Sequence, residues 1–326
     1  MYFDLDDEQR DLAAAARDFL GSSTSPATAR AALETAGTDT LPGRVELVKS
    51  GFATITVPEK AGGGGGAVLD LAVVAEQAGR VLAGPSLVTF ARAAVLLDGD
   101  DDRLAALAEG SLAVAVVDDG PVLDAAGADT FLSRRGDDVV IGPGHVQVRE
   151  PIDPTRGLGD VVLGEAEVGA PDAAERWARA ERIGRTILAA EGLGAAARAL
   201  EIGVEYTKQR HAFGRPIGSY QAVKHALVDV YVEVEQLRSL VWWAAWAADH
   251  APEELPIAAA AAKGAAATTL ERAAETLIQV HGGIGFTWEH DAHLYWRRAK
   301  VDRLLLGDDI AAYDEVAGLA LAGKAK

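Results

Sequence analysis

The sequence predicts a mainly α-helical protein with a small middle β domain, an α+β fold class, and three observations support this prediction. Before residue 110 and after residue 171, apolar residues recur at three- and four-residue steps, a spacing typical of helices. Between these blocks, short β-branched runs are separated by glycine, proline and aspartate, as in strands joined by tight turns. The last block contains four long helical stretches with short connections, which favour an antiparallel bundle. We therefore expect a helical N-terminal domain at 1–110, a small β domain at 111–170 and a C-terminal four-helix bundle at 171–326.

The N-terminal block contains four expected helices and a glycine-rich connection. Asp6 with Gln9 resembles a capping box and opens a helix that extends to about Leu20. Further helices are expected at 43–50, 67–79 and 86–97. Residues 52–57 are expected to be extended and lead into five consecutive glycines, Gly62–Gly66. A glycine run can cradle phosphate, but this one lacks the Lys-Ser/Thr of a P-loop, so we expect a mobile loop.

The middle block contains four β-branched runs that we expect to form an antiparallel sheet with tight connections. These runs are 112–117, 138–141, 145–148 and 160–163. The block has room for five or six strands of typical length. After it, the helices of the bundle are expected at 172–209, 220–250, 256–280 and 308–321, with a break in the first expected near Gly184.

Composition excludes several classes of function. A net charge of −18 over 326 residues argues against nucleic acid or an anionic membrane surface as a main partner. No apolar run is long enough to span a membrane, and the N-terminus is acidic where a signal peptide is basic, so a cytoplasmic location is expected. The chain has no cysteine, no His-Glu-x-x-His motif and no Gly-x-Ser-x-Gly motif. We expect no metal site and no serine nucleophile.

One stretch, Arg210–Gln221, is a candidate anion site. Two arginines lie beside the start of a helix, whose unpaired N–H groups and dipole favour negative charge. Pro216 keeps the residue before it out of the helical region, and Ser219 is well placed as an N-cap. A phosphate-bearing ligand fits this pattern. The alternative is a corner between two helices whose arginines face water.

A second candidate edge is Gln279–His290, where three glycines occur in four positions after a helix. Glycines remove side chains where another backbone or a ligand comes close. Gln279 and His281 offer hydrogen-bonding groups there. The alternative is that Gly282 ends the helix and the rest is an ordinary loop.

Taken together, these motifs resemble the acyl-CoA dehydrogenase family at both ends of the chain. The matching segments are Arg210–His225, Gln279–Phe286, Arg298–Lys300, Asp6–Gln9 and Glu76–Arg80. The family's fold has a helical N-terminal domain, a middle β domain and a C-terminal four-helix bundle, which agrees with the layout above. The resemblance implies that the bundle is the flavin-binding and oligomerisation domain.

The resemblance also implies FAD bound across a subunit boundary. The arginine that matches Arg210 reaches the pyrophosphate of a flavin held mainly by a neighbouring subunit. The other positions that match the family's contacts to the dinucleotide are Phe213, Gln221, Gln279, His281, Gly282 and Gly283. Arg185 matches a family arginine and is expected near the substrate.

The reaction implied by the resemblance is α,β-desaturation of an acyl-CoA thioester, for which a carboxylate must remove the acidic α-proton. Here the sequence departs from the family, because the two family positions for this base are Leu306 and Gly184. Glu191 lies two helical turns further along, roughly 10 Å away. No strand with the serine or threonine that would contact the flavin ring is identified.

The hypothesis that fits these departures is a subunit of an actinobacterial-type heteromeric acyl-CoA dehydrogenase, resembling those that act on steroid side-chain CoA thioesters. Its expected partners are the acyl-CoA substrate, a second acyl-CoA dehydrogenase subunit that carries the base in a heterotetramer, and an electron-transfer acceptor. A second hypothesis is a homo-oligomer in which Asp308, Asp309 or Glu289 acts as an unusual base. A third is a structural or regulatory subunit that binds no flavin.

Overall fold

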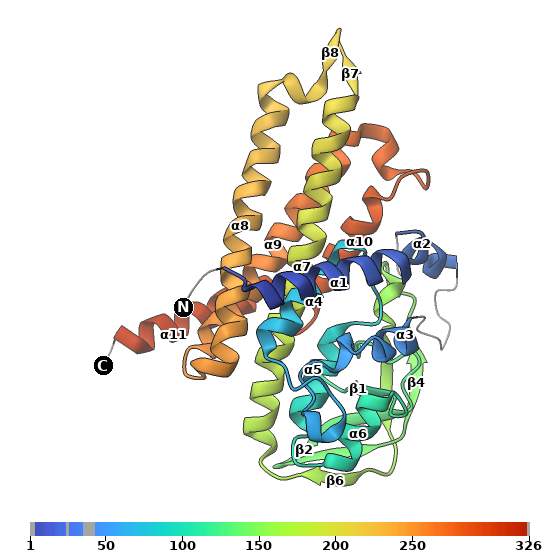
Figure 1. Cartoon of the computed structure of the whole chain (residues 1–326), viewed down its shortest axis with the longest axis vertical. Helices are drawn as coiled ribbons and strands as arrows, with labels where there is room; N and C mark the ends of the chain where they lie inside the picture. The colour runs from blue at the N-terminus through green and yellow to red at the C-terminus, as the bar shows by residue number, and fades with distance from the viewer. Residues whose placement is uncertain (1–3, 24–25, 35–42, 325–326) are drawn as a thin grey trace.

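The computed structural model describes residues 4–23, 26–34 and 43–324. Figure 1 shows one very long helix, α7, against which the N-terminal helices pack in the middle of the molecule, with the strands at one end and a hairpin at the other. This arrangement confirms the predicted fold class, mainly helical with a small β region. In the described part of the chain, no helix combines the length and apolar character that crossing a membrane requires.

The N-terminal block contains six helices in the described residues, two more than the sequence predicts. The helices are α1 (Asp7–Ser23), α2 (Pro26–Glu34), α3 (Arg44–Lys49), α4 (Val68–Arg80), α5 (Leu87–Leu96) and α6 (Asp101–Glu109). The capping box is confirmed, because Asp6 and Gln9 exchange hydrogen bonds of 2.8 and 3.2 Å between side chain and backbone. Helices α2 and α6 were not predicted, since both are short and have at most two apolar residues larger than alanine.

The segment from Phe52 to Gly66 is compact and hydrogen-bonded to itself, so the expectations of an extended run and a mobile loop are both wrong. Phe52–Thr54 and Glu59–Ala61 form 3₁₀ turns. All five glycine N–H groups of Gly62–Gly66 donate to carbonyls of the preceding 54–59 segment, at 2.8 to 3.2 Å. A Cβ on Gly63 would lie 2.2 Å from the carbonyl oxygen of Val57. The glycines serve close packing, and their N–H groups are not free for phosphate.

The middle block forms six strands, two of which the sequence did not reveal. They are β1 (Val114–Val116), β2 (Thr130–Arg135), β3 (Asp138–Gly142), β4 (Gly144–Val148), β5 (Gly159–Leu163) and β6 (Glu167–Ala170). One sheet has the order β1-β2-β3-β6, and β4 pairs with β5 in a second. The expectation of a purely antiparallel sheet is wrong, because β1 and β2 are parallel. The loop between them returns the chain to the start of β1, where Asp129 N–H donates to the carbonyl of Ala113.

The C-terminal block contains α7 (Ala173–Gln209), α8 (Gln221–His250), α9 (Leu255–His281), α10 (Ala292–Leu304) and α11 (Asp309–Lys324). Figure 1 shows α7, α8 and α9 running alongside one another. Helix α7 passes Gly184 without the expected break, and α10 was not predicted. Small residues allow the bundle to close tightly, since a Cβ on Gly192 of α7 would meet Ala266 of α9 at 3.4 Å.

Helices α4 and α7 cross with their backbones in contact through a reciprocal pair of glycines. A Cβ on Gly79 of α4 would lie 1.8 Å from the carbonyl oxygen of Glu191 on α7. A Cβ on Gly194 of α7 would lie 1.7 Å from the carbonyl oxygen of Glu76 on α4. Real Cβ contacts are never this short, so only glycine fits at either position.

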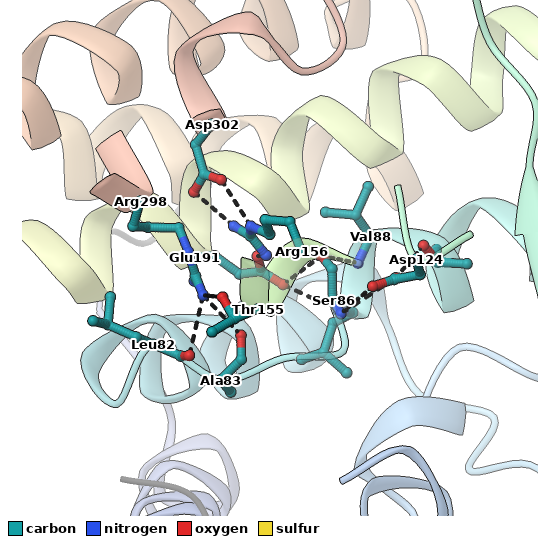
Figure 2. Close-up of polar contacts among 12 residues, drawn as sticks. Leu82, Ala83, Ser86, Val88, Asp124, Thr155, Arg156, Glu191, Arg298 and Asp302 are labelled. Atoms are coloured by element: carbon teal, nitrogen blue, oxygen red, sulfur yellow. Dashed lines mark hydrogen bonds and ion pairs between the residues drawn. The ribbon is translucent and has the colours of Figure 1, made fainter. Parts of the chain in front are cut away.

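A fully buried guanidinium joins the three blocks of the chain (Figure 2). Arg156, in the loop between β4 and β5, donates to Glu191 of α7 at 2.6 Å and to both oxygens of Asp302 of α10 at 2.8 and 2.6 Å. Glu191 also accepts from Ser86 Oγ at 2.9 Å and from Leu87 N–H at 3.0 Å, at the start of α5. Arg156 therefore holds the strand block, the bundle and the N-terminal helices together.

Two further buried groups extend this network. Arg298 of α10 donates to Asp153 at 2.5 Å, to Thr155 Oγ1 at 2.6 Å and to the carbonyl of Leu82 at 3.0 Å. The carboxylate of Asp124 accepts from Ser86 N–H at 3.2 Å and from Thr89 Oγ1 at 2.5 Å. Burial raises the pKa of Asp124 to about 6, and its hydrogen bonds only partly offset that rise.

Replacing Arg156 by methionine is expected to destabilise the protein by about 3–5 kcal/mol, because two buried carboxylates lose their shared cation. Denaturant unfolding measures the loss. The matched control is Arg149→Met, which breaks a bidentate pair with Asp160, both bonds 2.8 Å, between side chains that are 51% and 45% exposed. That control is expected to cost less than about 1 kcal/mol. Similar losses in the two variants would contradict a special role for Arg156.

Asp124→Asn is expected to change how stability depends on pH. Since folding raises the pKa of Asp124 from 3.8 to about 6, its favourable contribution is complete below about pH 4 and is lost as the pH rises through 6. Asparagine keeps an acceptor oxygen and lacks this titration. Relative to the wild type, the variant should gain up to about 3 kcal/mol in free energy of unfolding between pH 4 and pH 7. A pH-independent difference between the two proteins would contradict the assignment.

Candidate functional site

The Arg210–Gln221 stretch forms the corner between α7 and α8 at one end of the bundle (Figure 1). Arg210 ends α7, and the chain then makes a two-stranded hairpin, β7 (His211–Ala212) with β8 (Arg215–Pro216). Phe213 and Gly214 at its tip both have positive φ, 54° and 80°, as in a type I′ turn. The hairpin therefore holds the Phe213 ring out, 97% exposed.

The N-terminus of α8 is left without a side-chain cap. The expectation that Ser219 caps it is wrong, because Ser219 Oγ donates back to the carbonyl of Pro216 at 2.7 Å. Tyr220 takes the cap position without accepting a side-chain bond. Its hydroxyl donates to the carbonyl of Ala212 at 3.0 Å, and the Arg215 guanidinium lies 4.0 Å from its ring centre. The first N–H groups of α8 therefore remain available to an anion.

The end of α9 lies against this corner. An apolar groove of about 660 Å³ runs between α9 and the start of α8, and its wall includes Phe213, Ile217, Gln279 and Val280. Phe213 and Gln279, far apart in the sequence, are thus brought to one groove. Arg210, Gln221, Gly282 and Gly283 adjoin it in the chain and are exposed. A Cβ on Gly282 or Gly283 would meet nothing within 4 Å, so the backbone is open to approach there.

His281 is placed differently from the other predicted contacts. Its side chain is 5% exposed, its Nδ1–H donates to the carbonyl of Leu277 at 2.8 Å, and its ring stacks on Tyr206 at 3.9 Å. The ring therefore does not face the groove. A role for His281 in cofactor binding stays a prediction.

The two family positions for the base do come together, at the opposite end of α7. A Cβ on Gly184 would lie 3.1 Å from Leu306 Cδ1, so both positions line one spot in the fold. The same Cβ would lie 2.7 Å from Arg92 Cδ of α5. Arg92 is 3% exposed and pairs with Asp118 through two bonds of 2.5 and 2.6 Å. The side chain of Arg92 therefore occupies the space next to Gly184.

Sequence reasoning missed Arg92, although a signal was present. It is the one charged residue in the apolar helix Leu87–Leu96, and such an isolated charge is unusual in a buried segment. Sequence reasoning also missed Ser133 on β2. Ser133 lines a cavity of about 550 Å³ together with Val117, Arg185, Leu306 and other residues, so a serine-bearing strand does face this region.

The weaker candidates for a base are already engaged or distant. Asp308 Oδ1 accepts from Ala311 N–H at 2.8 Å and caps α11. Asp309 pairs with Arg303 at 2.7 and 3.2 Å. Glu289 lies in the loop before α10, while Leu306 follows the other end of that helix, about 20 Å further for 13 residues. A role for any of these three carboxylates as a base stays a prediction.

Arg185 and Glu191 are also engaged. Arg185 donates to the carbonyl of Leu306 at 2.9 Å and pairs with Glu315 at 2.6 Å and Glu181 at 2.7 Å, so it holds the 306–307 turn while lining the cavity. Contact between Arg185 and a substrate stays a prediction. Glu191 is committed to Arg156 and cannot serve as a base.

The corner and the Gly184 spot are separate places on the molecule. Gly184 lies 26 residues before Arg210, which ends the same unbroken helix, and this separation corresponds to about 39 Å. One dinucleotide cannot touch both. Among the described residues, no group of three or more histidine or acidic side chains is arranged to hold a metal ion.

Comparisons with known proteins match both ends of the chain. Residues 6–99 match the family model of the acyl-CoA dehydrogenase N-terminal domain, and residues 179–317 match that of the C-terminal domain. The chain is 38% identical to the acyl-CoA dehydrogenase IpdE2 of Mycobacterium tuberculosis over 86% of this chain and 87% of that protein. It is 36% identical to FadE34 of the same organism over 78% of this chain, but over only 38% of that longer protein.

Solved structures agree. A variant of the Tcur3481-Tcur3483 steroid ACAD superposes with a TM-score of 0.86 and 27% identity, covering 98% of this chain and 99% of that chain. Butyryl-CoA dehydrogenase from Megasphaera elsdenii superposes with a TM-score of 0.82 at 22% identity, covering 98% of this chain and 100% of that chain, which shows a common fold.

Proposed function

The chain belongs to the acyl-CoA dehydrogenase family of FAD-dependent oxidoreductases, and from this premise we propose that it is the subunit of a heteromeric acyl-CoA dehydrogenase that lacks the base. The substrate of the complex is an acyl-CoA thioester, which undergoes α,β-desaturation. When bound, FAD would supply the hydride acceptor for the β-hydrogen. This chain helps to hold the cofactor, and a second acyl-CoA dehydrogenase subunit removes the α-proton.

The observation that carries this proposal is the side chain of Arg92 beside Gly184 and Leu306. Removal of the α-proton needs a group that can accept a proton at neutral pH. Arginine stays protonated and can only donate hydrogen bonds. Among the described carboxylates, Asp118, Asp119 and Glu181 line the cavity with Leu306, but Asp118 is paired with Arg92 and Glu181 with Arg185. Asp308, Asp309 and Glu191 are engaged elsewhere, and neither position 184 nor position 306 carries a carboxylate. The self-sufficient homo-oligomer is therefore disfavoured.

The corner fits the diphosphate of FAD. Arg210 is exposed and makes no ion pair with any described residue, unlike most arginines of this acidic chain. Beside it lie the uncapped N-terminus of α8 and the open backbone at Gly282 and Gly283. Charge-assisted bonds from arginine and helix N–H groups are the usual means of holding phosphate. Phe213, Gln221 and Gln279 would contact the rest of the dinucleotide.

The separation of about 39 Å between the corner and Gly184 supports a shared cofactor, since a flavin whose diphosphate lies at Arg210 must place its ring in a neighbouring subunit. Val228, Tyr231 and Val232 of α8 are 54%, 56% and 46% exposed and would be covered by such a neighbour. The structure at 27% identity is a Tcur3481-Tcur3483 steroid ACAD, which supports a partner subunit in the proposed heterotetramer and a steroid-type CoA ester.

Arg210→Ala is expected to weaken FAD binding by roughly 10- to 100-fold, because a charge-assisted contact to phosphate is worth about 1.5–3 kcal/mol. The chain is purified in complex with a co-expressed second acyl-CoA dehydrogenase subunit, and the flavin-to-protein ratio is read from absorbance after gel filtration. Lys208→Ala removes an equal charge nearby, from a side chain paired only with Glu205, and should leave the ratio unchanged. Full flavin content in the Arg210 variant would refute the proposal that this corner holds the diphosphate of FAD. A colourless wild-type complex would favour the flavin-free regulatory subunit.

Leu306→Glu is expected to leave turnover of the complex within about twofold, because the new carboxylate would meet Arg92 and lie in a subunit that does not supply the base. Substituting glutamine for the partner's carboxylate at the corresponding position should abolish turnover. Both are measured by dye-coupled oxidation of an acyl-CoA. Flavin bleaching by acyl-CoA in this chain purified alone would overturn the assignment.

A further inference from the structure

Three aromatic rings beneath the Gly282–Gly283 turn connect the two halves of the corner. His281, the last residue of α9, stacks on Tyr206 of α7 with ring centres 3.9 Å apart and planes 25° apart. On its other side lies His290, with ring centres 4.1 Å apart. The carbonyl of Tyr206 accepts the N–H of Arg210 at 2.9 Å. One residue, Tyr206, therefore contacts both Arg210 and the residue that precedes Gly282.

The hydrogen bonds of His281 require a neutral ring. A carbonyl can only accept, so Nδ1 carries the proton that is donated to Leu277. Nε2 is buried and has no partner among the described residues. A second proton would have to be placed there, without an acceptor and without water. Burial lowers the pKa of His281, and the neighbouring His290 adds to that effect.

His290 has the same requirement at the other end of the turn. Its Nδ1 accepts the N–H of Ala292 at 3.1 Å, where α10 begins. Protonation of that nitrogen would break the bond, because a protonated Nδ1 cannot accept. The 282–291 segment is therefore anchored at both ends by neutral imidazole rings.

The surroundings offer little compensation for an added positive charge. The titratable and charged groups that face these rings are Tyr206 from α7, Arg30 from α2, Asp291 before α10, and His293 and Arg297 from α10. Asp291 is already paired with Arg30. Arg297 donates to Nδ1 of His293 at 3.3 Å. Burial lowers the pKa of His290 and of His293 as well.

We propose that His281 is a positioning residue of the FAD corner: its neutral ring, held between Tyr206 and His290, fixes the Gly282–Gly283 backbone relative to Arg210, so that the complex retains flavin at neutral pH and releases it in mild acid. This inference rests on the proposed function. It assigns His281 an indirect role in cofactor binding, in place of the direct contact that the sequence suggested.

The experiment measures flavin retention by the two-subunit complex at about pH 7.5 and about pH 5, from the fluorescence of free flavin after ultrafiltration. The wild type should retain flavin at the higher pH and lose it at the lower. His281→Phe keeps a ring that can stack on Tyr206 but cannot titrate, so retention should be within about twofold of the wild type at pH 7.5. Its loss of flavin in acid should be smaller than that of the wild type, because only His290 of the two rings still titrates. His281→Ala loses the stack and should bind roughly three- to tenfold more weakly at both pH values.

The control is His225→Phe, which alters an exposed histidine of α8 near the same corner and should keep the wild-type pH dependence. Circular dichroism confirms that each variant is folded. Wild-type pH dependence in His281→Phe, or wild-type affinity in His281→Ala, overturns the inference. If Arg210→Ala loosens flavin while the His281 variants behave as the wild type, only this inference fails. If Arg210→Ala has no effect, the proposed function fails and takes the inference with it.

Discussion

The fold depends on how one cation, Arg156, is shared between the carboxylates of Glu191 and Asp302 (Figure 2). Removing three charged side chains from water is costly, and the cost is recovered only when every donor and acceptor is matched. Glu191 meets this condition by also accepting from Ser86 and Leu87 at the start of α5. The strand block, the N-terminal helices and the bundle can therefore reach their native positions only together.

Helix α7 extends from the buried Arg156 network in both directions and separates two regions of the molecule. Its 37 residues run unbroken from the cavity beside Leu306 to the hairpin that carries Phe213. The middle of the helix is fixed through Glu191, so both ends have defined positions. A rigid helix of this length keeps the proposed cofactor corner and the cavity beside Leu306 far apart, which suits the proposed role of a subunit that assists a reaction whose base lies elsewhere.

Much of this could be predicted from sequence wherever the signal was local. Periodic apolar positions gave α1, α4, α5, α7, α8 and α9 to within a few residues, and the motifs located the corner. Non-local contacts decided the rest. Strand β2, with the sequence TFLSRR, has no clean alternation, and its parallel partner depends on a loop that no local rule specifies. The inward position of His281 depends on Tyr206, 75 residues away. The position of Arg92 next to Gly184 and Leu306 likewise depends on contacts between segments far apart in the sequence.

The reciprocal glycines at the crossing of α4 and α7 carry an evolutionary consequence. At Gly79 and Gly194, the obstacle to a larger residue is a carbonyl oxygen of the facing main chain, not a side chain. A crowded side-chain pair can be relieved by shrinking its partner, but a peptide group cannot be shrunk. These two positions should therefore stay glycine whatever their neighbours become, and no second-site substitution should rescue a larger residue there. The crossing is then inherited unchanged or lost.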